Sequence, residues 1–544
     1  MSNDENWWRD AVIYQIYPRS FQDSSGDGVG DLPGITSRLE YVASLGVDAI
    51  WLSPVFASPM ADMGYDVSNY TDIDPLFGTL MDFDALVARA HELGLKLIID
   101  QVLSHTSSQH PWFEESRVSR DNAKSDWYVW ANPQQDGSPP NNWPSVFGGS
   151  AWSWDSRRRQ YYLHNFLGSQ PDLNFHNGEV QDALLEVMRF WLERGVDGFR
   201  LDTVNFYFHD RQLRDNPPCL DGAAQHAVNP YEMQDHRHSK TQPENIAFLE
   251  RMRTLTDGYS ARMMVGEVGE SLRAIEVMAE YTAGTGRLHM AYSFDMLGTP
   301  FSAQHFRSKI DGFFSGAPDG WPCWSFSNHD VMRHVSRWRE HGHSDDAIAI
   351  QAAAMLLSFP GSICLYQGEE LGQTETDIEF HELTDPPGIT FWPDYKGRDG
   401  CRTPMVWSAQ AEHGGFSQAK PWLPVKAPQA ERSVDQQEGR DDSVLAFYRA
   451  MIALRKSHKA LAGGAYGFVD LPEPVLGLWR GEGADALLCL FNLSPQERVL
   501  ALDGTACALE QSRAARLDGS VLELGPNGFC LIAGDRDRLT VRVV

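Results

Sequence analysis

The chain has 544 residues, too many for one ordinary domain, and 42% of them are apolar, which is enough for a large hydrophobic core. The formal net charge of −28 argues against nucleic acid as a partner and against binding to an anionic membrane, because both need a concentrated basic surface. A neutral small molecule would not be repelled by this charge.

The cysteines and the N-terminal residues indicate in which cellular compartment the protein is expected. The seven cysteines are scattered, odd in number and form no C-x-x-C pair, so we expect neither a disulfide framework nor a zinc site. The segment Met1–Asp10 has no basic stretch followed by an apolar one, and no apolar run approaches the length of a membrane span. These features predict a cytoplasmic protein that does not use a membrane.

Short apolar runs alternate with amphipathic segments along most of the chain. Near-continuous apolar runs are typical of strands in a buried parallel sheet. The eight runs that we expect to be strands are Ala11–Phe21, Val47–Phe56, Leu95–Val102, Val196–Val204, Met263–Val268, Leu288–Met296, Pro322–Asn328 and Ser362–Tyr366. Helical spacing of apolar residues lies between them, as in Phe83–Ala90 and Leu184–Trp191. Eight such units predict an α/β fold, a (β/α)8 TIM barrel with its active site at the carboxyl ends of the strands.

Two segments do not fit the barrel repeat. Residues 104–175 follow the third predicted strand, are too long for a loop and are rich in tryptophan, so we expect an inserted subdomain. Its tryptophans could stack on sugars, but forming the subdomain's own core is the commoner role of each. From residue 465 the pattern changes to short strands with turn signals, which predicts a C-terminal β-sandwich over 465–544. The barrel then comprises 1–103 and 176–464.

Four of the predicted strands end in an acidic residue: Asp100, Asp202, Glu267 and Asp330. Side chains alternate along a strand, so Arg200 shares a face with Asp202 and would keep that carboxylate ionised. One Arg–Asp pair alone could equally be a core ion pair. Four buried acids at one rim would cost stability unless a site used them, and together they predict catalysis.

The motifs around these acids resemble the α-amylase family of glycoside hydrolases, in its α-glucosidase and oligo-1,6-glucosidase branch. The stretches that carry the resemblance are Tyr14–Phe21, Gly64–Val67, Asp100–His105, Gln170–Asn174, Gly198–Asn205, Val265–Val268, Phe326–Asp330 and Arg402–Met405. They occur in the family's order from about Trp7 to the C-terminal segment. As a set they are highly specific.

The resemblance implies that Asp202 is the nucleophile and Glu267 the general acid/base. Asp330 would bind the sugar 2- and 3-hydroxyls. Glycoside cleavage passes through an oxocarbenium-like state, so Glu267 must be protonated when Asp202 is ionised. In a retaining enzyme the two carboxyls are about 5–5.5 Å apart.

The resemblance also implies a set of substrate-binding residues. Arg200, His105 and His329 would position the glucose, and Tyr65 would stack beneath its ring. Asp66 and Arg402 resemble the pair that closes the pocket of α-glucosidases and binds the terminal 4-hydroxyl, which would restrict the enzyme to releasing one terminal glucose. Arg402 could otherwise cap a surface helix.

Three residues bear on the substrate. In similar enzymes Thr after the nucleophile accompanies α-1,4 cleavage and Val accompanies α-1,6 cleavage, so Thr203 favours a maltose-like substrate. Phe147 and Phe166 lie where related enzymes have aromatic residues near the reaction site, although each could be a packing residue.

A metal site is predicted near the N-terminus. Asp23, Ser25, Asp27 and Asp31 alternate along Asp23–Asp31, with the carbonyl of Val29 available, and hard oxygen ligands at this spacing suit Ca²⁺. The segment resembles the calcium loop of this branch, where Asn or Asp often stands at the position of Ser25. Without a metal it would be a Gly/Asp turn.

These features predict a retaining, exo-acting α-glucosidase that releases terminal α-glucose from small sugars or alkyl or aryl α-glucosides, with transglucosylation as a side reaction. Two alternatives stay open: a sucrose or trehalose isomerase or synthase on the same scaffold, and a non-catalytic relative. The segment Asn205–Gln242 is expected to overhang the pocket. Its Asp210, Arg214 and Asn216 could shape the acceptor site or belong to a solvated loop, and the oligomeric state stays open.

Overall fold

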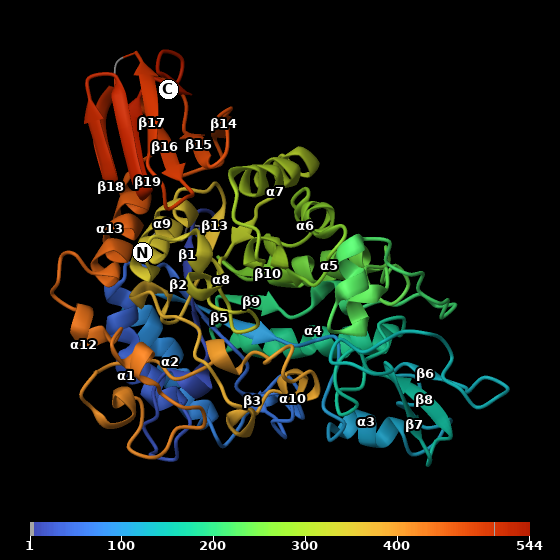
Figure 1. The fold of residues 1–544 in the computed structure, drawn as a ribbon. Coiled ribbons are helices and arrows are strands. Elements are labelled where there is room, and N and C mark those ends of the chain that lie inside the picture. Colours follow the sequence, from blue (N-terminus) through green and yellow to red (C-terminus); the bar gives the residue numbers. More distant parts are fainter. Residues whose placement is uncertain (1–4, 505) are drawn as a thin grey trace.

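A computed structural model describes residues 5–504 and 506–544 of the chain, and its largest unit is a parallel β-barrel surrounded by helices (Figure 1). The barrel strands are β1 (Val12–Ile16), β2 (Ala49–Leu52), β5 (Lys96–Gln101), β9 (Gly198–Leu201), β10 (Met263–Val268), β11 (Met290–Ser293), β12 (Cys323–Trp324) and β13 (Ser362–Tyr366). They pair in this order, β13 pairs with β1, and a parallel bridge between Ala291 and Pro322 joins β11 to the β12 segment. The predicted TIM barrel is confirmed.

Helices cover the outside of the barrel and bury the apolar faces that the sequence indicates. The longer helices are α1 (Leu32–Ser44), α2 (Leu80–Glu92), α4 (Gly178–Glu193), α5 (Asn245–Thr256), α6 (Ala274–Thr282), α7 (Ala303–Gly316), α9 (Asp345–Leu356) and α13 (Val444–Ser457). Helix α2 begins with a capping box between Thr79 and Asp82, which satisfies amide groups of its first turn. The buried residues of α2 and α4 include all those that the periodicity selects.

Register places the acids inside the barrel at its carboxyl end. Asp100 on β5 pairs with Arg200 on β9, which pairs with Val265 on β10. One layer further, Glu267 pairs with Tyr292 on β11. Apolar residues such as Ile98, Val265 and Met290 fill the barrel below them. The interior is therefore a packed core whose upper layer is polar.

The segment between β5 and β9 contains α3 (Pro111–Ser116) and a three-stranded sheet of β6 (Trp130–Ala131), β7 (Trp152–Asp155) and β8 (Gln160–Leu163). Trp143 and Trp152 are buried in its own core, with ring centroids 6.0 Å apart. Trp154 is exposed, and no tryptophan of the segment lines the main cavity. The other tryptophans of the segment serve packing, which is the alternative to sugar stacking that the sequence left open.

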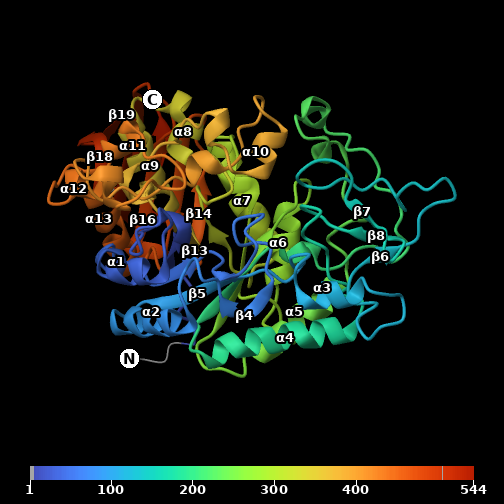
Figure 2. The same cartoon turned by 90° about the horizontal axis from the view of Figure 1, so that it is seen from below.

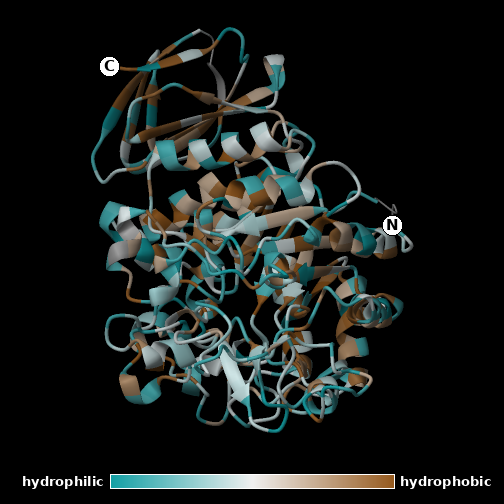
Figure 3. Cartoon of the chain, turned by 90° about the vertical axis from the view of Figure 1, so that its right-hand side faces the viewer, coloured by the Kyte–Doolittle hydropathy of each residue, from teal (hydrophilic) through white to brown (hydrophobic). Residues whose placement is uncertain are grey.

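The last strands form an antiparallel sheet on the far side of the barrel from β6–β8 (Figures 1 and 2). They are β14 (Tyr466–Val469), β15 (Val475–Arg480), β16 (Ala486–Asn492), β17 (Arg498–Asp503), β18 (Ala506–Asp518), β19 (Val521–Gly534) and β20 (Thr540–Val543). All seven belong to one hydrogen-bonded sheet, since the long strand β19 pairs with β16, β17 and β18. Hydrophobic segments gather in this sheet and in the helices next to it (Figure 3).

Within the described ranges, no helix is both long enough and apolar enough to cross a membrane.

Candidate active site

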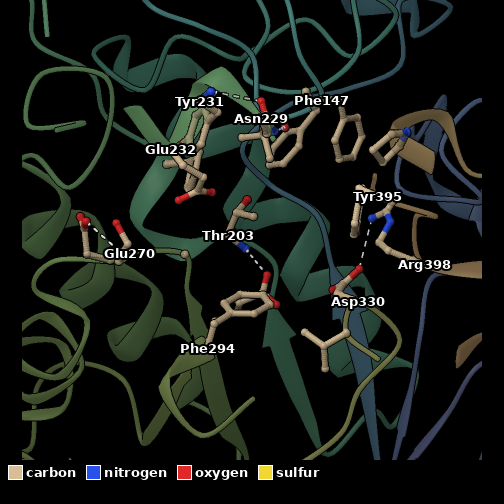
Figure 4. Close-up of a pocket in the computed structure, with 18 of the residues that line it drawn as sticks. Phe147, Thr203, Asn229, Tyr231, Glu232, Glu270, Phe294, Asp330, Tyr395 and Arg398 are labelled. Atoms are coloured by element: carbon tan, nitrogen blue, oxygen red, sulfur yellow. Dashed lines mark hydrogen bonds and ion pairs between the residues drawn. The ribbon is translucent and has the colours of Figure 1, made fainter. Parts of the chain in front are cut away.

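The main cavity has a volume of ≈ 780 Å³ and lies at the carboxyl ends of the barrel strands. The predicted site residues that line it are Asp202, Glu267, Asp330, Tyr65, His105, Thr203, Phe147 and Phe166. Asp330 and Arg398 lie on one side of Thr203, and Glu232 and Glu270 lie on the other (Figure 4). We call Asp62, Tyr65, Asp330 and Arg398 the arginine end of the cavity, and Asn229, Tyr231, Glu232, Lys240 and Glu270 the loop end.

The side chain of Arg200 connects three of the acids. It is fully buried, and its Nη1 lies 2.8 Å from Asp100 Oδ1 and 2.6 Å from Asp202 Oδ1, while Nη2 contacts Glu267 Oε1. Tyr292 Oη accepts from Nε and Nη2 of this arginine and donates to Glu267 Oε1 at 2.8 Å. Two carboxylates at the cavity wall therefore share one guanidinium.

Asp202 and Glu267 titrate in an unusual range. Burial raises the pKa of each carboxyl to about 7, although Arg200 acts in the opposite direction on both. Because the two groups are close and coupled, their protons belong to the pair. Near neutral pH the pair therefore holds about one proton, which is the state that an acid and a nucleophile need together.

Thr203 contacts both of these acids from an uncommon backbone conformation. Its φ of 39° and ψ of 50° lie in the left-handed region, which β-branched residues rarely adopt. Its backbone N–H donates to Glu267 Oε2 at 3.2 Å, and its hydroxyl lies 3.3 Å from Asp202 Oδ2 and 3.1 Å from Ser104 Oγ. Strained conformations of this kind cluster at functional sites.

Asp330 is held by two arginines. Its Oδ1 lies 3.2 Å from Arg398 Nη1 and 3.0 Å from Arg402 Nη2, and its Oδ2 lies 3.3 Å from His329 Nε2. Burial raises the pKa of Asp330, but His329, Arg398 and Arg402 outweigh that effect and lower it. Asp330 is therefore ionised when the Asp202–Glu267 pair holds its proton.

The resemblance implies that Asp66 and Arg402 close the cavity. The acid and arginine that line the cavity at this end are Asp62 and Arg398 instead. Arg398 lines the cavity, with Nη2 3.0 Å from Asp62 Oδ1 and 2.7 Å from Asp385 Oδ1. Asp66 is fully buried and accepts from Ser58 Oγ and from the backbone N–H groups of its own loop.

Three predicted sugar-binding residues lie behind the wall of the cavity. Arg200, His329 and Arg402 are each fully buried and do not line it. Arg402 donates to the carbonyl of His329 at 2.7 Å, and the ring of His329 stacks on Tyr65 with centroids 5.4 Å apart. In this structure these three side chains contact the acids and Tyr65, and the glucose-binding role that the resemblance implies for them stays a prediction.

Tyr65 and His105 are placed in the cavity as expected. Tyr65 Oη donates to Asp100 Oδ2 at 3.1 Å, which holds the ring against the floor. His105 Nε2 lies 3.0 Å from the carbonyl oxygen of Tyr65 and 3.2 Å from Gln170 Nε2. Burial lowers the pKa of His105 to about 4, so this ring is neutral at pH 7.

Phe147 and Phe166 form an aromatic corner of the cavity. Their ring centroids are 5.5 Å apart in an edge-to-face arrangement, and the guanidinium of Arg398 lies 5.0 Å from the ring of Phe147. Phe166 also packs on His105 and Phe206. Both phenylalanines therefore pack and line the cavity at once.

The segment after β9 overhangs the cavity, but through other residues than those singled out. Asp210 and Arg214 pair with each other at 2.9 Å, and Asn216 bonds Ser239, so none of the three lines the cavity. The loop-end residues, together with Phe206, Phe294 and Tyr395, were missed. A motif lies close to several of the cavity residues that were not singled out: Phe206 directly follows Asn205, Glu270 is two residues after Val268, Arg398 is four before Arg402 and Asp62 is three before Tyr65.

The predicted calcium loop is closed by its own donors. Asp23 accepts from the N–H groups of Gly26 and Gly28 and from Ser417 Oγ, and Asp31 accepts from Ser24 and caps α1 through Gly34 N–H. The exposed Asp27 accepts from Val29 N–H at 2.9 Å, and Ser25 Oγ donates to Asp23. No group of three acid, histidine or cysteine side chains suited to a metal occurs in the described part of the chain. A Ca²⁺ ion at this loop stays a prediction of the resemblance.

Residues 15–464 match the sequence profile of the Alpha-amylase family, described as the alpha amylase catalytic domain. The chain belongs to this family of glycoside hydrolases. It is 56% identical over 514 residues to a probable alpha-glucosidase of Rhizobium meliloti (strain 1021), covering 92% of this chain and 93% of that protein.

Solved structures extend the likeness to the whole fold. The alpha-glucosyl transfer enzyme XgtA is 53% identical with a TM-score of 0.92, over 97% of this chain and 99% of that one. The trehalulose synthase MutB from Pseudomonas mesoacidophila MX-45 is 32% identical with a TM-score of 0.87, over 98% and 99% of the two chains. The likeness therefore extends over the barrel, the segment between β5 and β9, and the C-terminal sheet.

Proposed function

We propose that the protein is a retaining, exo-acting α-glucosidase in which Asp202 is the nucleophile and Glu267 the acid/base. The observation that carries this proposal is the shared guanidinium of Arg200, which holds both carboxylates at the cavity wall. Acids so close to one group favour the short carboxyl spacing of retaining enzymes over the wide spacing of inverting ones. The relative named as a probable alpha-glucosidase supports the same assignment.

In the first step Asp202 attacks C1 of the terminal glucose while Glu267 protonates the glycosidic oxygen, and the leaving group departs. The glucosyl ester formed on Asp202 is then attacked by water, whose proton passes to Glu267, so both acids return to their starting state. Thr203 N–H, 3.2 Å from Glu267 Oε2, stabilises its carboxylate between the steps. Asp330, kept ionised by its arginines, would accept hydrogen bonds from sugar hydroxyls.

Release of single glucose units follows from the arginine end. The Asp62–Arg398–Asp330 ion pairs form a wall beyond which a second sugar would have to displace buried charges. The same charged groups can bond the 4-hydroxyl of a terminal glucose. For the linkage, the hydroxyl of Thr203 beside Asp202 supports α-1,4 substrates such as maltose.

The stereochemistry of the first product tests the mechanism. Proton NMR during hydrolysis of 4-nitrophenyl α-glucoside, which releases a single glucose, should show α-glucose before mutarotation, and initial β-glucose would rule out retention. Asp202→Asn should lose nearly all activity, and Glu267→Gln should lose about 10²–10⁴-fold on maltose. A variant Asp202→Asn that hydrolyses at the wild-type rate would overturn the assignment.

A second candidate is glucosyl transfer, including isomerisation of sucrose. It is favoured by the likeness to an alpha-glucosyl transfer enzyme and to a trehalulose synthase. Chromatography of products from maltose, sucrose, trehalose and isomaltose separates the two functions. Free glucose as the main product supports hydrolysis, whereas isomers or glucosides of added alcohols support transfer.

The calcium ion is tested by thermal melting. A higher Tm with Ca²⁺ than with a chelator would support a structural ion at Asp23–Asp31, and an equal Tm would remove it from the proposal.

A further inference from the structure

The loop end contains a buried lysine that the mechanism above does not use. Lys240 is 3% exposed and lines the cavity. Its Nζ donates to the carbonyl of Gly269 at 2.7 Å and to Tyr231 Oη at 3.0 Å. It also lies 4.9 Å from the ring centroid of Phe206. A buried ammonium is costly unless its donors are used, so this placement needs a reason.

Gly269 is the second residue after Glu267, at the end of β10. Its N–H donates to Asn205 Oδ1 at 2.9 Å, and its carbonyl accepts from Asn205 Nδ2 at 3.2 Å as well as from Lys240. A Cβ at Gly269 would lie 3.0 Å from the ring of Phe206, so a larger residue would require that ring or this backbone to shift. The backbone next to Glu267 is therefore held through both the N–H and the carbonyl of Gly269.

Asn205 follows the nucleophile by three residues, so the same contacts reach the end of β9. Its Nδ2 also donates to Thr241 Oγ1 at 2.9 Å, and its carbonyl accepts from Thr241 N–H at 2.7 Å. Thr241 has a φ of 55°, a second β-branched residue in the left-handed region, and its hydroxyl donates to Glu270 at 3.0 Å. Strain of this kind persists only where surrounding contacts hold it.

We propose that Lys240 is a positioning residue that, with Asn205, Thr241 and Gly269, fixes the acid/base Glu267 relative to Asp202. These four residues, the lysine clamp, join the two strand ends that carry the reacting acids. A shift of about 1 Å in a reacting group can cost on the order of 100-fold in rate. The clamp rests on the proposed function, because it acts through the acid role of Glu267.

The test uses substrates that differ in their need for an acid. Maltose releases a poor leaving group, whereas 4-nitrophenolate is a stable anion that departs with little protonation. Both values of kcat/KM report the first chemical step. Lys240→Met should lower kcat/KM for maltose by roughly 10- to 100-fold and that for 4-nitrophenyl α-glucoside by less than about threefold. Lys240→Arg, which keeps the charge and donors, should recover much of the loss.

Lys456→Met is the matched control, since Lys456 also donates to a backbone carbonyl, that of Gly46 at 2.9 Å, on α13 outside the cavity lining. This variant should leave kcat/KM unchanged for both substrates. Equal losses on the two substrates in Lys240→Met would overturn the positioning role and leave the α-glucosidase intact. A wild-type protein that hydrolyses neither substrate would overturn the proposed function and the clamp with it.

Stability is measured in parallel by thermal melting. If Lys240→Met gives no cooperative melt, Asn205→Ser removes the other donor to the carbonyl of Gly269 and should show the same selective loss on maltose. If the ratio of kcat/KM for maltose to that for 4-nitrophenyl α-glucoside is unchanged in Asn205→Ser, the clamp would also be overturned.

Discussion

The two ends of the cavity are built in different ways. At the arginine end, Arg398 connects Asp62, Asp330 and Asp385, which come from three distant parts of the chain, and Asp62 and Asp385 are buried. The loop end consists mainly of residues 229–240 and 269–271, and Glu232 and the rim residue Val228 are exposed. In the proposed function the first end would bind the terminal glucose in one fixed arrangement, and the second would accept leaving groups of different sizes.

This difference separates what each end would contribute to the reaction. A substitution at the arginine end should affect every α-glucoside equally, because each presents the same terminal glucose. A substitution at the loop end should discriminate between leaving groups. The acids between the two ends should affect both substrates, and stability as well.

The largest effect is expected for Arg200→Met, at the boundary of the two ends. Removing this buried cation leaves Asp100, Asp202 and Glu267 without their shared partner, and breaking such a pair costs about 3–5 kcal/mol. The pKa values of these acids are already raised, and without Arg200 they rise further. A raised carboxyl pKa means that stability is lost as pH rises, so the deficit should be larger at pH 8 than at pH 5. Urea unfolding at both pH values measures it; a deficit below about 1 kcal/mol at pH 8 would contradict this role.

Arg398→Met should come next and should act equally on all substrates. It removes a charged donor from the arginine end, and hydrogen bonds to charged groups contribute about 1.5–3 kcal/mol, so kcat/KM should fall about 10- to 100-fold. The loss should be the same for maltose and 4-nitrophenyl α-glucoside. Arg214→Met is the control, because Arg214 is exposed, pairs with Asp210 and does not line the cavity. Selective loss on one substrate would place Arg398 in contact with the leaving group.

Tyr292→Phe should change the pH profile. With one proton on the Asp202–Glu267 pair as the active state, kcat/KM should be bell-shaped around pH 7, because at lower pH the nucleophile is protonated and at higher pH the acid is not. Tyr292 Oη donates to Glu267, which stabilises its charged form. Losing that bond raises the pKa of Glu267, so the alkaline limb should move upward by up to about one unit.

Tyr14→Phe is the control for that experiment. Tyr14 is also buried and donates to a carboxylate, Glu370 Oε1 at 2.8 Å, but it does not line the cavity. Its pH profile should match the wild type. An alkaline limb in Tyr292→Phe that stays in place, or moves downward, would contradict the assignment of that limb to Glu267.

The same division explains what the sequence could predict. Barrel strands are regular, so alternation and apolar runs predict that Asp100, Asp202 and Glu267 lie at the carboxyl ends of interior strands, and β10 and β13 have the predicted bounds. The tertiary partners of a long side chain do not follow from spacing. The sequence shows two arginines, Arg398 and Arg402, that could reach the cavity. Only the fold shows that Arg402 donates to the carbonyl of His329 while Arg398 lines the cavity.

The loop end was harder to predict for a physical reason. Residues 205–242 have no repeating pattern, and the side chains that reach the cavity are set by contacts such as that between Lys240 and Gly269, 29 positions apart. Charged residues in such a stretch are usually solvated; Arg214 is exposed, whereas its partner Asp210 is buried without lining the cavity. The spacing of Asp23–Asp31 suits a cation and also suits a turn whose amides bind the same oxygens, so the sequence alone does not choose between the two.

The smallest effect is expected at Thr203, between the two ends. Val has nearly the same shape and would suffer the same backbone strain at φ 39°, so Thr203→Val isolates the hydroxyl that bonds Asp202 and Ser104. One such hydrogen bond contributes about 0.5–1.5 kcal/mol, so the ratio of kcat/KM for maltose to that for isomaltose should fall about 2- to 10-fold. Thr203→Ser keeps the hydroxyl and should keep the ratio. If Thr203→Val keeps the ratio and Thr203→Ser changes it, the methyl group and not the hydroxyl selects the linkage, and selection would then arise from packing against the leaving group at the loop end.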